Sequence, residues 1–172
     1  MSGSGLRLFP VGHSGNQSES VEEVEAIAAL IDDVVGVASW IDRHGTRRSV
    51  GLQDILVVAP YNAQVRLLID RLPNGARVGT VDKFQGQEAP IVIYSMTTSS
   101  ATDAPHGMGF LYSPHRLNVA TSRALCLAVV VASPALFQAE CRTPGQMKLA
   151  NAFCRFAEMA EAAHELTLAA GV

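Results

Sequence analysis

The sequence predicts a three-layer α/β fold in which helices cover both faces of a mainly parallel β-sheet. Short strands that are apolar throughout alternate along the chain with amphipathic helices, and this alternation is typical of parallel sheets that are buried on both faces. With 172 residues, 48% of them hydrophobic and 17% charged, the chain has the size and composition of one packed domain. We expect a flexible, tag-like end at residues 1–5, one domain over 6–165 and a weakly patterned tail over 166–172.

The expected elements follow from hydrophobic periodicity and from turn residues. Apolar residues recur at helical spacing over residues 19–41, where Ser18 or Ser20 is suited to cap the helix. The strands are expected at residues 54–59, 77–80, 91–95 and 127–132. Further helices are expected at residues 62–72, at 114–124, briefly from Pro134, and over 143–163. The Gly- and Pro-rich residues 99–109 predict a long surface loop.

Charge and cysteine usage narrow the classes of protein. The formal net charge is −3, which argues against a strongly basic, free-standing nucleic-acid binder. The basic residues between Arg43 and Arg48 are interpreted as a solvated loop, although a local basic strip is the alternative. No apolar run is long enough to span a bilayer, so we expect no membrane partner. The three cysteines have neither metal-type nor pairing-type spacing, which favours a reducing cytoplasm.

One polar segment, residues 79–88, separates two of the predicted strands. Because ligands of parallel sheets lie beyond the carboxyl ends of the strands, we expect the polar segments of this chain to meet at that edge. Gly86 allows a ligand to approach the backbone, Glu88 is suited to accept hydrogen bonds from ribose hydroxyls, and Gln85 is suited to orient a phosphate or a water. Taken singly, the segment is equally typical of a capped turn with a solvated glutamate.

Two further segments carry candidate residues. Arg123 ends a predicted helix directly before a buried strand, where it can stabilise charge on a transferring phosphoryl group; an ordinary surface ion pair is the alternative. Pro60 ends a strand before a helix whose free N–H groups suit a phosphate. There Tyr61 is a candidate for stacking on a base, and Asn62 is a candidate for a backbone contact or a helix cap.

The chain has no G-x-x-x-x-G-K-[ST] phosphate loop and no paired acids at a strand end to hold magnesium. Phosphoryl transfer depends on both features. We therefore expect this chain alone to be inactive on nucleotides. A doubly wound metabolic enzyme is disfavoured as well, because the dinucleotide glycine fingerprint is absent.

Taken together and in this order, the segments resemble three motifs of the C-terminal RecA-like domain of superfamily 1 helicases, in the branch that includes the nonsense-mediated-decay helicase and related DNA helicases. Residues 60–64 resemble motif IV, residues 79–88 resemble motif V, and residues 109–112 with 116–124 resemble motif VI and its lead-in. Residues 141–151 resemble the end of bacterial proteins that fuse a RecB-like nuclease to such a helicase.

The resemblance implies roles for the matching residues. Gly86 and Glu88 would contact the phosphates and ribose of ATP, and Gln85 would couple the two sites. Arg123 would be the arginine finger that reaches the γ-phosphate. Thr80, with Tyr61 and Asn62, would contact single-stranded nucleic acid, DNA in preference to RNA.

The resemblance also implies a partner domain, and the sequence departs from the family pattern in two places. An N-terminal RecA-like domain of the same polypeptide would hold the triphosphate and Mg²⁺. Leu125 stands where many relatives carry a second basic residue, and the Tyr-Arg segment that usually opens the domain is missing. The alternative function is a non-catalytic RecA-like module that senses nucleotides or docks proteins.

Overall fold

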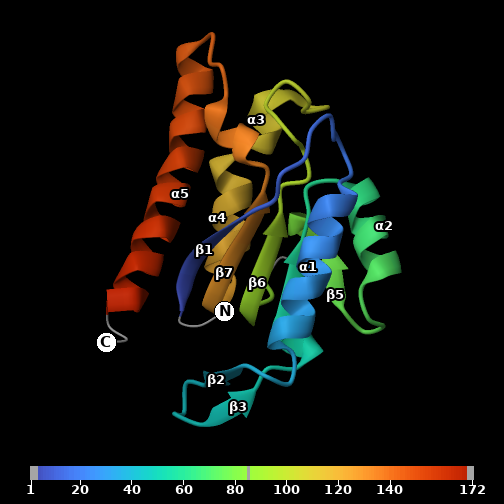
Figure 1. Ribbon diagram of the computed structural model, residues 1–172, viewed down its shortest axis with the longest axis vertical. Coiled ribbons are helices and arrows are strands. Elements are labelled where there is room, and N and C mark those ends of the chain that lie inside the picture. Colours follow the sequence, from blue (N-terminus) through green and yellow to red (C-terminus); the bar gives the residue numbers. More distant parts are fainter. Residues whose placement is uncertain (1–3, 85, 170–172) are drawn as a thin grey trace.

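The computed structural model describes residues 4–84 and 86–169, and it has the predicted layered α/β architecture (Figure 1). The strands are β1 (Gly5–Pro10), β2 (Ser39–Ile41), β3 (Arg47–Ser49), β4 (Ile55–Val58), β5 (Arg77–Gly79), β6 (Ala89–Ser95) and β7 (Ala124–Ala132). The α-helices are α1 (Val21–Val34), α2 (Asn62–Arg71), α3 (Gly107–Leu111), α4 (Pro114–Ser122) and α5 (Pro144–Ala169). Short 3₁₀ helices lie at Leu52–Asp54, Val81–Phe84 and Pro134–Gln138.

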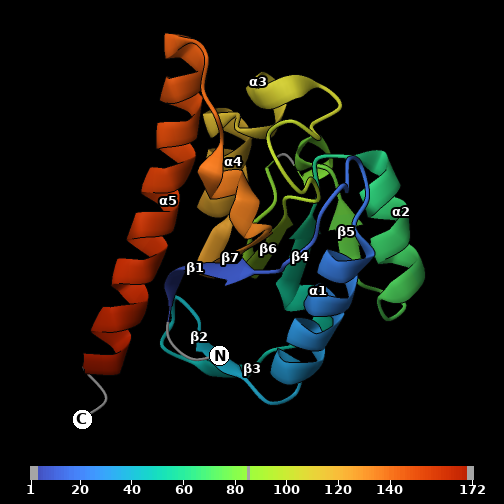
Figure 2. The same ribbon diagram turned by 45° about the horizontal axis from the view of Figure 1, so that its top comes forward.

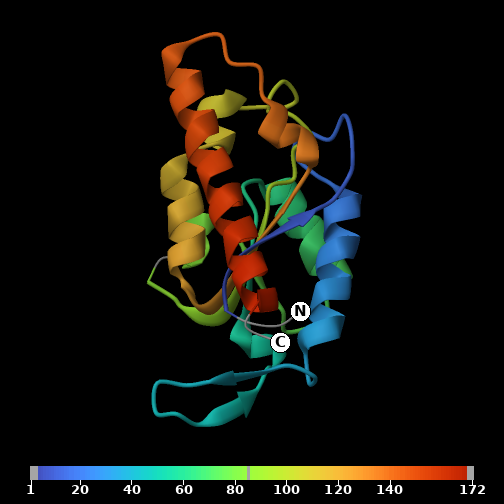
Figure 3. The same cartoon turned by 60° about the vertical axis from the view of Figure 1, so that its left-hand side comes forward.

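Five strands form one sheet in the order β1-β7-β6-β4-β5, and every neighbouring pair is parallel. Helices α1 and α2 pack on one face, whereas α3, α4 and α5 pack on the other (Figure 3). Side chains alternate along each strand, so Ile55 and Val57 join the core under α1 while Leu56 and Val58 join the core under α5. All four are at most 1% exposed, which explains why the strand sequence is apolar throughout.

The first helix is shorter than the sequence predicts. Ser20 caps α1 by accepting a hydrogen bond from the Glu23 amide. Of the two predicted caps, Ser18 and Ser20, the structure thus has Ser20. The helix ends at Val34, and Gly36 follows with a φ of +74°, a left-handed conformation that suits glycine. The apolar spacing that continues to Ile41 belongs instead to β2, which forms an antiparallel hairpin with β3.

Three other differences concern the ends of the chain and one loop. The sequence predicts no strand near residue 5, yet β1 pairs with β7 from Gly5 to Pro10. The expected loop at 99–109 ends in the short helix α3. Helix α5 continues to Ala169, past its predicted end at Ala163 and into the residues expected to form a tail.

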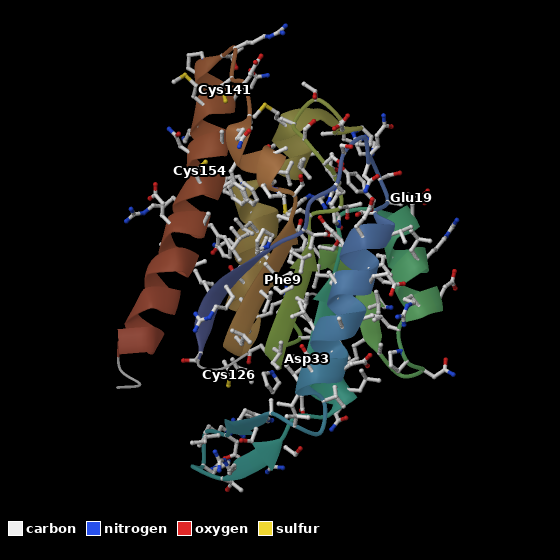
Figure 4. All side chains as sticks on the ribbon, viewed as in Figure 1. Phe9, Glu19, Asp33, Cys126, Cys141 and Cys154 are labelled. Atoms are coloured by element: carbon white, nitrogen blue, oxygen red, sulfur yellow. The ribbon has the colours of Figure 1, made fainter. Side chains whose placement is uncertain are left out.

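No helix among residues 4–84 and 86–169 is long and apolar enough to cross a membrane. The three cysteines are free thiols. Cys141 lies beside the amino end of α5 and Cys154 lies within that helix, and both are far from Cys126 at the opposite end of the sheet (Figure 4).

Helix α5 is held to the sheet by an aromatic cluster. Phe153 is 2% exposed; its ring stacks on Phe137 at 4.6 Å between centroids and meets the edge of Tyr112 at 5.3 Å. We expect Phe153→Ala to lower the free energy of unfolding by about 3–5 kcal/mol, because it leaves a cavity in this core. Met147 lies on the same helix and is 54% exposed, so Met147→Ala should change it by less than about 0.5 kcal/mol. Urea denaturation of both variants measures the difference, and equal losses would contradict an integral role for α5.

Candidate nucleotide and nucleic-acid edges

The candidate residues lie at two opposite edges of the sheet. Glu88 and Arg123 immediately precede β6 and β7, at the amino edge, whereas Tyr61 and Thr80 follow β4 and β5, at the carboxyl edge. The expectation that all the polar segments meet at the carboxyl edge is therefore wrong. Strand β6 spans seven residues between the two edges, or about 20 Å at the usual rise per residue.

Strand pairing brings Glu88 and Arg123 together. Ala89 is paired with Ala124 across the two strands, and the Ala89 amide donates to the Arg123 carbonyl oxygen at 3.0 Å. The residues just before each strand are therefore neighbours, although 35 positions (123 − 88) separate them along the chain. Arg123 also caps the carboxyl end of α4, as the sequence predicts for a residue that ends a helix.

The guanidinium of Arg123 is oriented by a backbone carbonyl and forms no ion pair within the part of the chain that the structure describes. Its Nη1 donates to the Gln87 carbonyl oxygen at 3.2 Å. Among the described residues, its Nε has no hydrogen-bond partner, although it is buried, and no carboxylate lies within 4.0 Å of its nitrogens. A planar cation held in this way keeps donors available for an anionic ligand.

The loop before β6 also exposes an acid and a backbone turn. Glu88 is exposed and forms no ion pair with the residues that the structure describes. Gly86 has a φ of +80°, and a Cβ at this position would meet nothing within 4 Å. Glycine is thus favoured here by the backbone conformation rather than by crowding. Gln85 lies outside the described residues.

Gln87 is a residue of this edge that the sequence analysis did not single out. Its backbone carbonyl accepts from Arg123, and its side-chain oxygen accepts a hydrogen bond from Arg77 Nη2 at 2.8 Å. Its backbone amide donates to the Phe84 carbonyl at 3.0 Å. These contacts fix the carbonyl that orients Arg123. The sequence carries no signal for this role, because it depends on the backbone of Gln87.

At the carboxyl edge, Tyr61 is packed inside an aromatic cluster. Its ring is 6% exposed and stacks on Phe110 at 5.4 Å, with His106 6.1 Å away. The Arg116 guanidinium lies 4.0 Å from the centre of the Phe110 ring, a cation–π contact. Burial raises the pKa of Tyr61 against smaller opposing effects of Thr98 and Arg116, so the phenol stays neutral. Phe110 thus covers one face of the Tyr61 ring. Stacking of Tyr61 on a base stays a prediction.

Asn62 and Thr80 are more accessible. Asn62 is exposed on the first turn of α2, where Tyr61 rather than Asn62 takes the capping position. Thr80 is half-buried, and its carbonyl accepts from the Lys83 amide at 3.1 Å. Both side chains remain candidates for contacting a nucleic-acid backbone.

A buried polar network supports this edge. Glu23 accepts hydrogen bonds from Ser95 Oγ at 2.5 Å and from the Thr97 amide at 2.8 Å, and it lies 3.1 Å from His13 Nε2. His13 Nδ1 lies 2.7 Å from Ser99 Oγ. Thr97 has a φ of +71°, a conformation that costs a residue with a branched Cβ free energy unless its surroundings fix it.

Ser99, His13 and Glu23 are ordered like the residues of a hydrolase triad. The His13 and Glu23 side chains are fully buried and Ser99 is 2% exposed, so no substrate reaches the hydroxyl. The group therefore anchors the loop after β6. Gln64, in the segment that resembles motif IV, completes it by accepting from the Ser20 amide at 2.7 Å and donating to Ser95 Oγ at 3.1 Å.

The parallel sheet with helices on both faces is a RecA-like α/β fold. A family model described as an AAA domain (AAA_12) matches residues 11–135. The chain is 34% identical to the probable RNA helicase armi of Drosophila melanogaster over 98 residues. This match covers 52% of this chain and 8% of that protein. The chain is 33% identical over 91 residues to the regulator of nonsense transcripts 1 homolog of Neurospora crassa, covering 47% and 8%. It is 42% identical over 74 residues to the DNA polymerase alpha-associated DNA helicase A of Schizosaccharomyces pombe, covering 41% and 11%.

The chain therefore belongs to this AAA-domain family, and these relatives identify it as a superfamily 1 helicase domain. It spans between 8% and 11% of the length of these three relatives.

The backbone requirement at Gly86 can be tested by stability. We expect Gly86→Ala to lower the free energy of unfolding by about 1–2 kcal/mol, because an L-residue is strained at positive φ. Gly109 lies in α3 without a positive φ and with open space around its Cα. Gly109→Ala should thus leave stability unchanged or raise it by up to about 1 kcal/mol. Urea denaturation compares the two variants; a harmless Gly86→Ala would contradict the assigned conformation.

Proposed function

We propose that this chain is the C-terminal motor domain of an ATP-dependent superfamily 1 helicase and contributes half of a composite nucleotide site. The observation that carries the proposal is the juxtaposition of the Arg123 guanidinium and the Glu88 carboxylate at one edge of the sheet, neither of which forms an ion pair with the residues that the structure describes. The family membership makes ATP the matching ligand.

The two side chains suit different parts of ATP. The carboxylate of Glu88 accepts hydrogen bonds from ribose hydroxyls, and the loop at Gly86 presents backbone near the phosphates. Arg123 stabilises the charge that develops on the transferring γ-phosphoryl group, as an arginine finger supplied to a triphosphate anchored elsewhere. Gln87 acts as a positioning residue, because its carbonyl orients Arg123.

The other half of the site belongs to a second domain. Among residues 4–84 and 86–169, no group of three or more His, Cys, Asp or Glu side chains is arranged to hold a metal ion, and the sequence has no phosphate loop. We assign Mg²⁺ binding, phosphate anchoring and activation of the attacking water to an N-terminal RecA-like domain of the same polypeptide. Closure of that domain on Arg123 would then be driven by ATP, and reopening by hydrolysis.

Single-stranded nucleic acid is assigned to the carboxyl edge. Thr80 and Asn62 are accessible there, and the N-terminus of α2 offers free amides for a phosphate. The segment from Thr80 to Glu88 runs between the two edges, so it is suited to couple nucleotide closure to movement along the strand. The relatives are named as RNA and DNA helicases; our expectation of DNA over RNA is tested by stimulating ATP turnover with either strand.

The decisive variant is Arg123→Ala in a protein that carries this chain together with its first motor domain. We expect ATP turnover stimulated by single strands to fall by ~10³ or more, because the developing charge loses its cation. Arg155 is exposed on α5 and pairs only with Glu158 among the described residues, so Arg155→Ala should retain full turnover.

Three outcomes would contradict parts of this account. ATP turnover at the wild-type rate in Arg123→Ala would refute the role of Arg123 as an arginine finger. ATP hydrolysis by this chain alone would refute a site shared between two domains. A two-domain protein that binds ATP without hydrolysing it would favour the non-catalytic nucleotide-sensing module.

A further inference from the structure

A buried strap follows β6 at the carboxyl edge of the sheet. The strap, residues 96–99, lies outside any helix or strand, yet each of its four residues is at most 2% exposed. Connecting segments usually run over the surface, because buried backbone groups must find hydrogen-bond partners. The strap also buries three hydroxyl side chains, those of Thr97, Thr98 and Ser99. Its conformation therefore depends on the groups that satisfy it.

Thr97 gives the strap a conformation that is unfavourable for its own side chain. Its φ is +71°, and every other described residue with a positive φ is a glycine. A residue with a branched Cβ keeps this conformation only where its surroundings determine it. The turn at Thr97 thus requires a partner that binds the backbone on this side of the strap.

Glu23 is that partner. Its Oε2 accepts hydrogen bonds from the Thr97 amide at 2.8 Å and from Ser95 Oγ at 2.5 Å. On the other side, its Oε1 lies 3.1 Å from His13 Nε2. The Glu23 side chain is fully buried and comes from the first turn of α1, where Ser20 binds the Glu23 amide. Loss of the carboxyl group would leave the Thr97 amide without this acceptor and allow the strap to relax.

Two contacts connect the strap and Ser95 to the start of α2. Thr98 Oγ1 donates to the Gln17 carbonyl at 2.7 Å and lies 3.4 Å from Tyr61 Oη. The strap thus lies between Tyr61 and the segment that joins β1 to α1 (Figure 2). Gln64, in the first turn of α2, donates to Ser95 Oγ at 3.1 Å. Because Tyr61 takes the capping position of α2, these contacts fix the place where α2 begins.

We propose that Glu23 is a positioning residue of the nucleic-acid edge. By holding the strap in its left-handed turn, Glu23 places Tyr61 and the first amides of α2 where they contact a single strand. The inference rests on the proposed function, which assigns single-stranded nucleic acid to this edge, and adds a buried residue of α1 that the nucleic acid does not reach. Its effect falls on the affinity for the single strand and not on the chemistry at Arg123, which lies at the opposite edge.

Steady-state ATP turnover separates these two effects in a protein that carries this chain together with its first motor domain. We expect Glu23→Ala to raise the single-strand concentration that gives half-maximal stimulation by about tenfold. Both kcat at saturating single strand and KM for ATP should stay within about twofold of the wild type, because the nucleotide site is unchanged.

Two rescue variants test the role of the left-handed turn. Glu23→Gln should behave as the wild type, because its side-chain oxygen can accept from the Thr97 amide while its nitrogen donates to His13. Thr97→Gly should restore most of the affinity in the Glu23→Ala background, because glycine adopts a positive φ without a partner that holds it. A purely structural loss of the buried carboxyl group would not be repaired by Thr97→Gly.

Leu30→Ala is the matched control. It also truncates a buried side chain of α1, about two helical turns from Glu23, where Leu30 packs against β6 and β7. It should lower the free energy of unfolding in urea and leave the half-stimulating concentration unchanged. Ser99→Ala is a milder change of the strap, since it removes the hydroxyl that lies 2.7 Å from His13 Nδ1. It should shift the concentration in the same direction by about threefold, and it serves if Glu23→Ala does not fold.

An unchanged half-stimulating concentration in Glu23→Ala and Ser99→Ala would overturn the inference. An equal shift in Leu30→Ala would overturn it as well, because the effect would then follow from lost stability. Failure of Thr97→Gly to recover affinity would refute the role of the left-handed turn. A wild-type protein whose ATP turnover does not respond to single strands would refute the proposed function itself, and Arg123→Ala tests the finger separately.

Discussion

The candidate site depends on one backbone contact, the hydrogen bond from the Ala89 amide to the Arg123 carbonyl oxygen. It aligns the first residues of β6 and β7, so the side chains just before each strand share one edge. A shift of one residue in this register would turn the side chains of a strand to the other face. The apolar cores on both faces prevent such a shift, because Val92 and Ile93 are buried on opposite faces and both would be displaced. The packing of the sheet thus determines the geometry of its polar edge.

The polar side chains of the two sheet edges differ in how their hydrogen-bonding groups are satisfied. At the amino edge, Glu88 and Arg123 are left without ion pairs among the described residues, which keeps both available to a ligand. At the carboxyl edge, a group of buried polar side chains is satisfied internally, with Glu23 accepting from Ser95 and Thr97, whereas Asn62 and Thr80 stay accessible. A satisfied buried network is rigid, and removal of one partner is costly. The domain therefore has a firm support at one edge and an incomplete site at the other.

Much of the fold could be predicted from the sequence, because β4, α2, β5, β6 and β7 each carry strong periodicity or a continuous apolar run. The hairpin could not, since its three-residue strands include Arg47 and Arg48, and its apolar residues continue the spacing of α1. Strand β1 was missed because Arg7 interrupts its apolar residues and Gly5 precedes them. Such strands are recognised only through their partners.

The candidate residues were chosen from motifs, and the structure gives them their positions. The general rule for parallel sheets suggested the carboxyl edge for all of them, which is wrong for Glu88 and Arg123. Phe110, which occupies the face of Tyr61, is 49 positions away along the chain (110 − 61), and local sequence carries no sign of that contact.

In the proposed function, Glu88 and Arg123 act on one nucleotide held against a second domain. A crystal structure of this chain with its first motor domain and a non-hydrolysable ATP analogue tests it most directly. We expect Glu88 oxygens within about 3 Å of the ribose hydroxyls and an Arg123 nitrogen within about 3 Å of a γ-phosphate oxygen of the same molecule. A nucleotide bound elsewhere, or bound with Arg123 turned away from its phosphates, would refute a nucleotide site shared by Glu88 and Arg123.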